Sequence, residues 1–232
     1  MPATSAAPSA EELLSRLASL GNEGHREGMA RFGINADTAL GISIPELRKI
    51  ARPLRGNHRL ALDLWKSGIH EARILASIID DPQQVTPRQL DSWVKAFNSW
   101  DLCDQCCINL FVRTEFAHDK AMEWSFRTEE FIKRAGFAMM AAIAVHDKNA
   151  PDEAFAPFLE RIREESTDNR NFVRKAVNWA LRQIGKRNGT LNAAAAETAR
   201  EIAMIDSKAA RWIASDALRE FQKLQSNARE SV

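Results

Sequence analysis

The chain has 232 residues, of which 45% are hydrophobic and 27% charged, and its formal net charge is +1. This is the composition of a soluble globular protein that is long enough to bury a large core. A net charge so close to zero excludes an overall basic field, so a nucleic-acid partner would have to meet a local basic patch.

Residues 1–10 are rich in Pro, Ser and Ala and contain neither a basic nor an apolar stretch. Such a segment is typical of a disordered leader and not of a signal peptide. No later stretch approaches the ~18 consecutive apolar residues that span a bilayer. The three cysteines all fall between Cys103 and Cys107, which is not the spacing of a disulfide framework. We therefore expect a cytoplasmic protein.

Beyond the leader, the sequence predicts one helix after another. Pro45 followed by Glu46 is typical of a helix start. Period-two apolar runs are missing, and Asn188-Gly189 is expected to end a helix and not to turn a hairpin. The expected fold class is all-α. The predicted helices span residues 11–20, 25–32, 44–51, 59–67, 71–80, 88–97, 98–114, 117–127, 129–145, 153–165, 169–187, 192–205 and 207–225.

A weak internal repeat indicates how these helices are arranged. Residues 131–138 resemble residues 172–179 at an offset of 41 residues, and a third similar segment follows at 207–213. Helix pairs that recur at this spacing are typical of an α-solenoid of HEAT-like repeats, an α-α superhelix. We expect one such domain over residues 11–225, followed by a flexible C-terminal tail at 226–232.

An indole and a carboxylate stand four residues apart at the start of a predicted helix. This spacing puts Trp100 and Asp104 on one face, and Ser99 or Asn98 can cap the helix. A flat ring beside an acid suits a cationic, ring-shaped substrate. The alternative is a half-buried Trp packed in a helix pair, with the acid stabilising the helix N-terminus. Taken alone, the pair favours this structural alternative.

The predicted helix at 170–187 carries six positive charges and no acid. Along it, Lys175, Trp179, Arg182 and Lys186 fall on one stripe. A basic stripe with an aromatic ring at its centre favours a surface that follows phosphates while the ring touches a sugar or base. The alternative is a solvated cationic helix whose Trp packs against the next repeat.

Five segments form a pattern that is more specific than any of them alone. They are Met29–Phe32 (MARF), Gly41–Arg48 (GISIPELR), Trp100–Asp104 (WDLCD), Arg134-Ala135 and Phe172–Arg182 (FVRKAVNWALR). With these segments in this order, most of the chain resembles the AlkD family of DNA alkylation repair proteins. Members of that family are bacterial DNA glycosylases built from HEAT-like helical repeats.

The resemblance implies a role for each matching position. Asp104 would be the catalytic acidic residue, and Trp100 and Trp179 would grip the deoxyribose of the damaged nucleotide. Arg134 would hold a nearby phosphate. Phe32 stands where the family often has Tyr, so an aromatic wall is kept and a hydroxyl is lost. Further DNA contacts are implied for Lys175, Arg182, Arg48 and the backbone around Ser43 and Ile44.

The same resemblance implies a substrate and a reaction. The substrate would be duplex DNA that contains purines alkylated at N3 or N7, and the reaction would be hydrolysis of the N-glycosidic bond without lyase activity. The family is understood to work without extruding the lesion into a deep pocket. No cofactor, metal or membrane is expected, and the protein is expected to be a monomer.

Several conspicuous residues have structural explanations. The three cysteines lie within one predicted helix, whereas a structural zinc site usually takes four ligands from two separated pairs, so buried packing is expected. Met139 and Met140 are expected in the core. Trp65, Trp93, Trp124 and Trp212 are expected to pack in the core or between repeats.

Two other functions stay open. One is a non-catalytic solenoid that binds distorted or branched DNA, which Phe32 in place of Tyr favours. The other is a protein-interaction scaffold, which the near-zero net charge favours and the acid-free stripe at 170–187 opposes.

Overall fold

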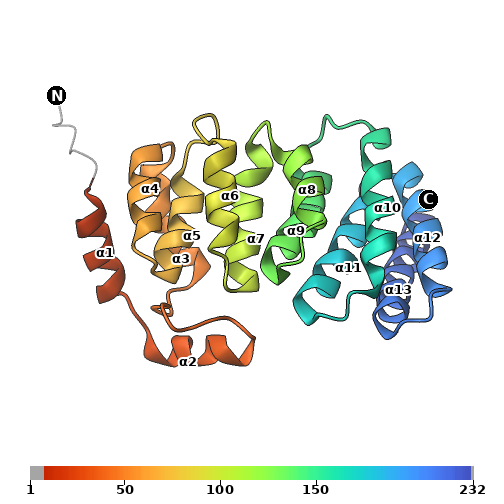
Figure 1. Cartoon of the computed structure of the whole chain (residues 1–232), viewed down its shortest axis with the longest axis horizontal. Coiled ribbons are helices and arrows are strands. Elements are labelled where there is room, and N and C mark those ends of the chain that lie inside the picture. The colour runs from red at the N-terminus through yellow and green to blue at the C-terminus, as the bar shows by residue number, and fades with distance from the viewer. Residues whose placement is uncertain (1–7, 231–232) are drawn as a thin grey trace. The chain divides into compact units, whose positions relative to one another are not determined.

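The computed structural model describes residues 8–230, and every regular element within that range is a helix (Figure 1). The all-α prediction is confirmed. The chain divides into two compact units, one up to Thr114 and one from Glu115 onward. No helix of the described range is long and apolar enough to cross a membrane.

The first unit is built around α5. Its elements are α1 (Ala10–Ser19), α2 (Glu23–Arg31), α3 (Ile44–Ala51), η1 (Arg52–Leu54), α4 (His58–Lys66), α5 (His70–Ile79), α6 (Pro87–Lys95), α7 (Trp100–Asn109) and η2 (Phe111–Arg113). α5 packs against α3, α4 and α7. α2 lies crosswise to α4, α5, α6 and α7 (Figure 1), and none of its own residues is buried.

The second unit is built around α9 and α11. Its elements are α8 (Ala117–Ser125), α9 (Glu130–His146), η3 (Asp152–Phe155), α10 (Ala156–Glu164), η4 (Glu165–Thr167), α11 (Asn171–Gly185), α12 (Gly189–Ala203) and α13 (Lys208–Glu230). α9 packs against α8 and α11, and α11 also contacts α12 and α13. The α8–α9 contact is close because of Gly136, where an added Cβ would come within 2.4 Å of the Ser125 nitrogen.

Most helices begin and end within a few residues of their predicted limits, and their caps explain why. Ser43 caps α3 by accepting a hydrogen bond from the backbone N–H of Glu46, and Pro45 occupies the first turn. Asn188 differs from its prediction. Its side chain accepts a hydrogen bond from the N–H of Leu191 at 2.9 Å, so Asn188-Gly189 begins α12 and does not end a helix.

The two ends of the chain are more helical than predicted. Residues 1–7 of the predicted leader lie outside the described residues, and Ser9 forms a capping box with Glu12 at the start of α1. α13 continues to Glu230, so residues 226–230 of the predicted tail are helical, while their flexibility stays a prediction. The predicted single domain over residues 11–225 stays a prediction.

The core of the first unit contains a stack of indoles. The rings of Trp65 and Trp93 lie 3.9 Å apart with 1° between their planes, and Phe97 and Phe111 extend the cluster. Aromatic rings dominate core energetics because each buries a large area. The core prediction for both indoles is confirmed.

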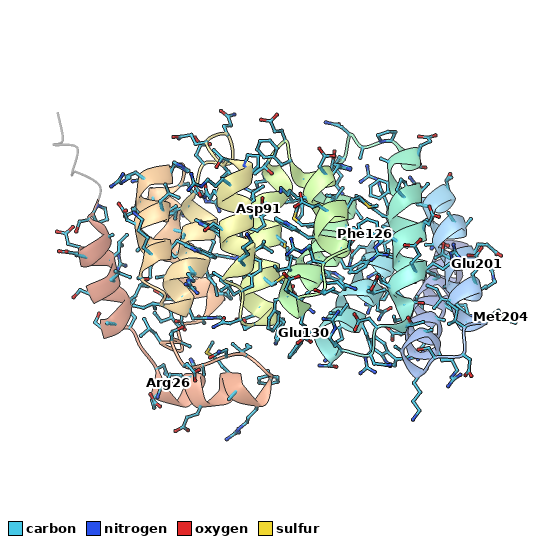
Figure 2. All side chains as sticks on the ribbon, viewed as in Figure 1. Arg26, Asp91, Phe126, Glu130, Glu201 and Met204 are labelled. Carbon is cyan, nitrogen blue, oxygen red and sulfur yellow. The ribbon has the colours of Figure 1, made fainter. Side chains whose placement is uncertain are left out.

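In the second unit, Trp124, Met139 and Met140 are buried as predicted. Trp212 is not: its side chain is 37% exposed, and the guanidinium of Arg174 lies 4.9 Å above its ring. Trp212 therefore lies outside the core, and it packs between helices under a cation from α11, which is the second of the two predicted arrangements. Other apolar side chains on the surface of this unit include Phe126 and Met204 (Figure 2).

Candidate nucleic-acid interface

The start of α7 presents an indole and a carboxylate one turn apart. Trp100 begins the helix, Asp104 follows four residues later, and both residues are partly exposed. Ser99 occupies the N-cap position, but its hydroxyl donates to the carboxylate of Asp101 and makes no capping bond. The expected capping by Ser99 or Asn98 is therefore wrong, while the shared face of Trp100 and Asp104 follows from the helix itself.

Trp100 is joined to the end of α2. Its indole Nε1–H donates a hydrogen bond to the carbonyl oxygen of Phe32 at 3.0 Å. Phe32 follows the last residue of α2, and it is 73% exposed. The structure thus brings Phe32, Trp100 and Asp104 together in the first unit, although Phe32 lies far from the other two in the sequence.

A buried acid on α5 holds the loop that leads into α3. Glu71 is 1% exposed, and its carboxylate accepts three hydrogen bonds from consecutive backbone N–H groups. The loop ends at Ser43, which is exposed, and Arg48 is exposed one turn into α3. The three donors are Leu40 at 2.7 Å, Gly41 at 2.7 Å and Ile42 at 3.2 Å.

His70, the neighbour of Glu71, reaches α7. Its Nε2 lies 2.8 Å from Oδ2 of Asp101. Burial raises the pKa of Asp101, but the hydrogen bond and charge of His70, with the Ser99 hydroxyl, outweigh burial and lower that pKa below its ordinary value. Beside this pair is a cavity of about 260 Å³ between α2, the loop, α5 and α7. Its walls include Met29, Ile34, Ile42, Ile74, His70 and Asp101.

In the second unit, part of the basic stripe on α11 is neutralised by ion pairs, and the rest of it is exposed. Lys175 is exposed and Trp179 is half-buried, one turn apart. Farther along the helix, Arg182 and Lys186 both form ion pairs with Glu220 of α13. The stripe lacks acids in its own helix, but α13 supplies two of them, because Asp216 also pairs with Arg182 at 3.2 Å. The expectation of an uncompensated stripe is therefore wrong for these two residues.

Arg134 lies deep in the helix layer of the second unit. It is 5% exposed, and its Nη1 donates a hydrogen bond to the carbonyl oxygen of Phe172 at 2.5 Å. This bond ties α9 to the first turn of α11, so the guanidinium has a structural partner of its own. A phosphate contact by Arg134 stays a prediction.

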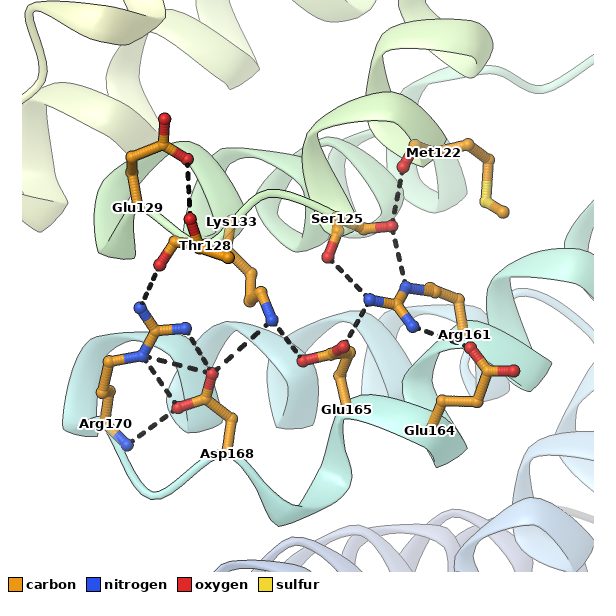
Figure 3. Close-up of polar contacts among 10 residues, drawn as sticks. All are labelled: Met122, Ser125, Thr128, Glu129, Lys133, Arg161, Glu164, Glu165, Asp168 and Arg170. Atoms are coloured by element: carbon orange, nitrogen blue, oxygen red, sulfur yellow. Dashed lines mark hydrogen bonds and ion pairs between the residues drawn. The ribbon is translucent and has the colours of Figure 1, made fainter.

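A charge network that no sequence motif marks joins the α8–α9 turn to the α10–α11 turn (Figure 3). Lys133 and Arg161 are both buried, and both pair with Glu165, Lys133 at 2.6 Å. Arg161 also donates to the backbone carbonyl of Ser125 at 3.0 Å. Removing one member of such a network leaves a buried charge without compensation, so the network holds the end of α8 and the start of α9 against the end of α10.

The three cysteines lie inside α7 and are fully buried free thiols. Burial raises the pKa of the Cys106 and Cys107 thiols well above the ordinary value. Among residues 8–230, no group of three or more His, Cys, Asp or Glu side chains is placed to hold a metal ion.

Comparison with known proteins decides the family. The family model described as DNA alkylation repair enzyme matches residues 13–221. The chain belongs to the DNA alkylation repair enzyme family. The uncharacterized protein Lin0241 of Listeria innocua is 26% identical over 168 residues, which are 71% of this chain and 73% of that protein. The predicted resemblance to the AlkD-like repair proteins is confirmed.

A solved structure confirms the fold of this DNA alkylation repair family member. It is described as "a new family of proteins related to the HEAT-like repeat DNA glycosylases with affinity for branched DNA structures". The two chains are 21% identical and superimpose with a TM-score of 0.75, over 91% of this chain and 95% of that one. The HEAT-like repeat prediction is therefore confirmed, while the roles of individual site residues stay predictions.

Proposed function

We propose that this DNA alkylation repair family member is a DNA glycosylase that hydrolyses the N-glycosidic bond of cationic N3- or N7-alkylated purines in duplex DNA. The observation that carries the proposal is the group on the first unit: the partly exposed indole of Trp100, the exposed ring of Phe32 and the carboxylate of Asp104. Flat apolar faces next to an acid suit a flat cation.

The proposed chemistry needs one carboxylate and no strong acid. An alkylated purine carries a formal positive charge and is already a good leaving group. As the C1′–N bond breaks, its electron pair neutralises the purine, and an oxocarbenium-like sugar develops. The ionised Asp104 stabilises that charge and accepts a hydrogen bond from the water that adds to C1′. The proton that this water loses passes to the carboxylate and then to solvent. The partly desolvated indole of Trp100 adds on the order of 1–2 kcal/mol of cation–π attraction, while a part for Trp179 stays a prediction.

The remaining proposed residues bind the DNA backbone. Lys175 and Arg48 are exposed cations, so both can reach a phosphate without breaking a buried contact. Arg182 is proposed as a weaker contact because Glu220 already neutralises it. The exposed Ser43 adds a hydroxyl and the backbone around it.

The test is release of free base from a duplex that contains 7-methylguanine. The wild-type protein should release the base, and Asp104→Asn should lower the single-turnover rate by about 100-fold or more. The affinity of this variant for DNA should be unchanged or slightly higher, because one negative charge is lost. Asp119→Asn, the same charge change at an exposed position on α8, should have no effect. Absence of base release from every alkylated duplex would exclude the proposal.

A second candidate is a non-catalytic protein that binds branched DNA. Two observations favour it: Phe32 lacks the hydroxyl that Tyr would supply, and Arg134 is buried against Phe172. The relative with the solved structure is described as having affinity for branched DNA. Tight, salt-dependent binding to a four-way junction, together with no base release from any lesion, would decide for this candidate.

A further inference from the structure

Two adjacent buried polar residues open α5, and neither belongs to the proposed catalytic or DNA-binding set. His70 is 2% exposed and Glu71 is 1% exposed. A buried charge is costly unless hydrogen bonds compensate it. Both side chains are compensated by elements about thirty residues away in the sequence, and those elements carry the proposed site.

Glu71 fixes the loop from which α2 and α3 depart. Its carboxylate accepts the N–H groups of Leu40 and Gly41, each at 2.7 Å. On the other side of this loop, the carbonyl oxygen of Leu40 accepts the N–H of Asn22, the N-cap of α2, at 2.8 Å. Ser43, the N-cap of α3, follows directly. One carboxylate thus sets the start of two helices.

Hydrogen bonds and one close backbone approach at Gly41, and not buried side chains, hold α2 in place. No residue of this helix is buried, and the cavity of about 260 Å³ lies between it and α5. A surface helix is usually fixed by buried side chains that pack tightly against the core, and α2 has none. At its other end, α2 is held by the bond from Trp100 Nε1 to the carbonyl oxygen of Phe32.

His70 fixes the first turn of α7. It contacts Asp101 at 2.8 Å, and the second oxygen of Asp101 accepts the hydroxyl of Ser99. Asp101 lies between Trp100 and Asp104 in the sequence, and Ser99 directly precedes Trp100. The imidazole therefore holds the turn from which both the indole and the proposed catalytic carboxylate project.

We infer that His70 and Glu71 are a pair of positioning residues with separate effects: His70 orients Trp100 and Asp104, and Glu71 orients the loop that presents Ser43, α2 and Phe32. The inference rests on the proposed function. Neither side chain needs to touch DNA, so each acts only through the residues that it holds. A misplacement of about 1 Å at a catalytic group can cost about 100-fold in rate.

The experiment measures the base-release rate at saturating enzyme and the affinity for duplex in separate assays. His70→Leu should lower the saturated rate by about 100-fold and change affinity by less than about threefold. His70→Gln keeps a donor and should restore the rate to within about tenfold of wild type. Glu71→Gln should weaken duplex binding about tenfold or more, because hydrogen bonds to a charged group are lost, and change the saturated rate by less than about threefold.

His58→Leu is the matched control. His58 forms a second imidazole–carboxylate pair in the first unit, partly buried, with Asp80 at 2.7 Å, at the end of α5 that is remote from His70. This variant should lose stability and keep both rate and affinity within about threefold of wild type. Equal losses in His58→Leu and His70→Leu would overturn the inference, because they would show a general effect of stability.

Hydrogen exchange separates failure of the inference from failure of the proposed function. Amides 40–42 should lose protection in Glu71→Gln alone, and amides 103–104, the first hydrogen-bonded amides of α7, in His70→Leu alone. If wild type releases no base, the glycosylase proposal fails, while these exchange patterns and the affinity loss in Glu71→Gln still test the positioning pair. Unchanged protection in both segments would overturn the inference, whatever the activity of the wild type.

Discussion

At the scale of single residues, Gly41 decides whether α2 can approach the loop beneath it. Its φ is 78°, which is the left-handed region that favours glycine. An added Cβ would also come within 2.2 Å of the Asn22 carbonyl oxygen and 2.8 Å of the Arg26 nitrogen. Both atoms belong to the backbone, so neither can move aside without shifting α2.

Gly41→Ala should therefore lower the free energy of unfolding by about 3 kcal/mol, since strain and overlap add. Gly56→Ala is the control, because Gly56 has a φ of 81° but no neighbouring atom within 4 Å of an added Cβ. Gly56→Ala should lower the free energy of unfolding by about 1 kcal/mol. Urea unfolding of both variants checks this prediction, and equal losses would show that the close approach at Gly41 contributes nothing.

At the scale of elements, the charge that α11 presents is set by α13. Glu220 pairs with both Arg182 and Lys186, and Asp216 accepts a hydrogen bond from Asn178 at 2.7 Å. A helix that looks strongly basic in sequence is thus partly neutral on one side. Its free cationic side includes Lys175, which is exposed.

Glu220→Gln should raise the affinity for duplex DNA a few-fold at low salt, because Lys186 loses its ion-pair partner and Arg182 keeps only its pair with Asp216. The dependence of affinity on salt should become steeper at the same time. Glu197→Gln makes the same charge change in an exposed ion pair with Arg200 on α12, and it should change affinity less. Affinity measurements over a salt series test both variants, and an equal gain in both would point to net charge alone.

At the scale of the whole molecule, stability should depend on pH through carboxyl groups held by arginines. The hydrogen bond from Arg127 lowers the pKa of Glu129 from 4.5 to about 2. Burial raises the pKa of Asp168, but the bonds from Arg170 outweigh it and leave that pKa below the ordinary value of 3.8. A lowered pKa means that the folded state binds protons less readily than the unfolded state, so these groups stabilise the fold above their ordinary pKa values.

The contribution of Glu129 and Asp168 to the free energy of unfolding should stay constant from pH 7 to about pH 5. It should be lost as the pH falls below about 4 toward 2. Thermal unfolding midpoints across this range check the prediction. Asp168→Asn should lower the midpoint at neutral pH and make its fall in acid shallower. A midpoint that rises below pH 4 would contradict the assigned sign.

Across the molecule, the sequence predicts what depends on neighbours along the chain and misses what depends on distant ones. Trp100 and Asp104 are predicted on one face because helical spacing alone determines it. His70 and Glu71 give no such signal, because their partners lie near residues 40 and 101 and an acid in a first helical turn is ordinary. The role of Glu220 is not predicted for the same reason, since its partner Arg182 lies 38 residues earlier in the sequence.

The burial of Cys103, Cys106 and Cys107 has a consequence for the proposed repair of alkylated DNA, which takes place where methylating agents are present. Thiolates, and not thiols, react with such electrophiles. The raised pKa of Cys106 and Cys107 keeps these thiols protonated, and complete burial shields all three. The helix that carries the proposed catalytic acid thus contains the most nucleophilic atoms of the chain in a form that the damaging reagent cannot attack.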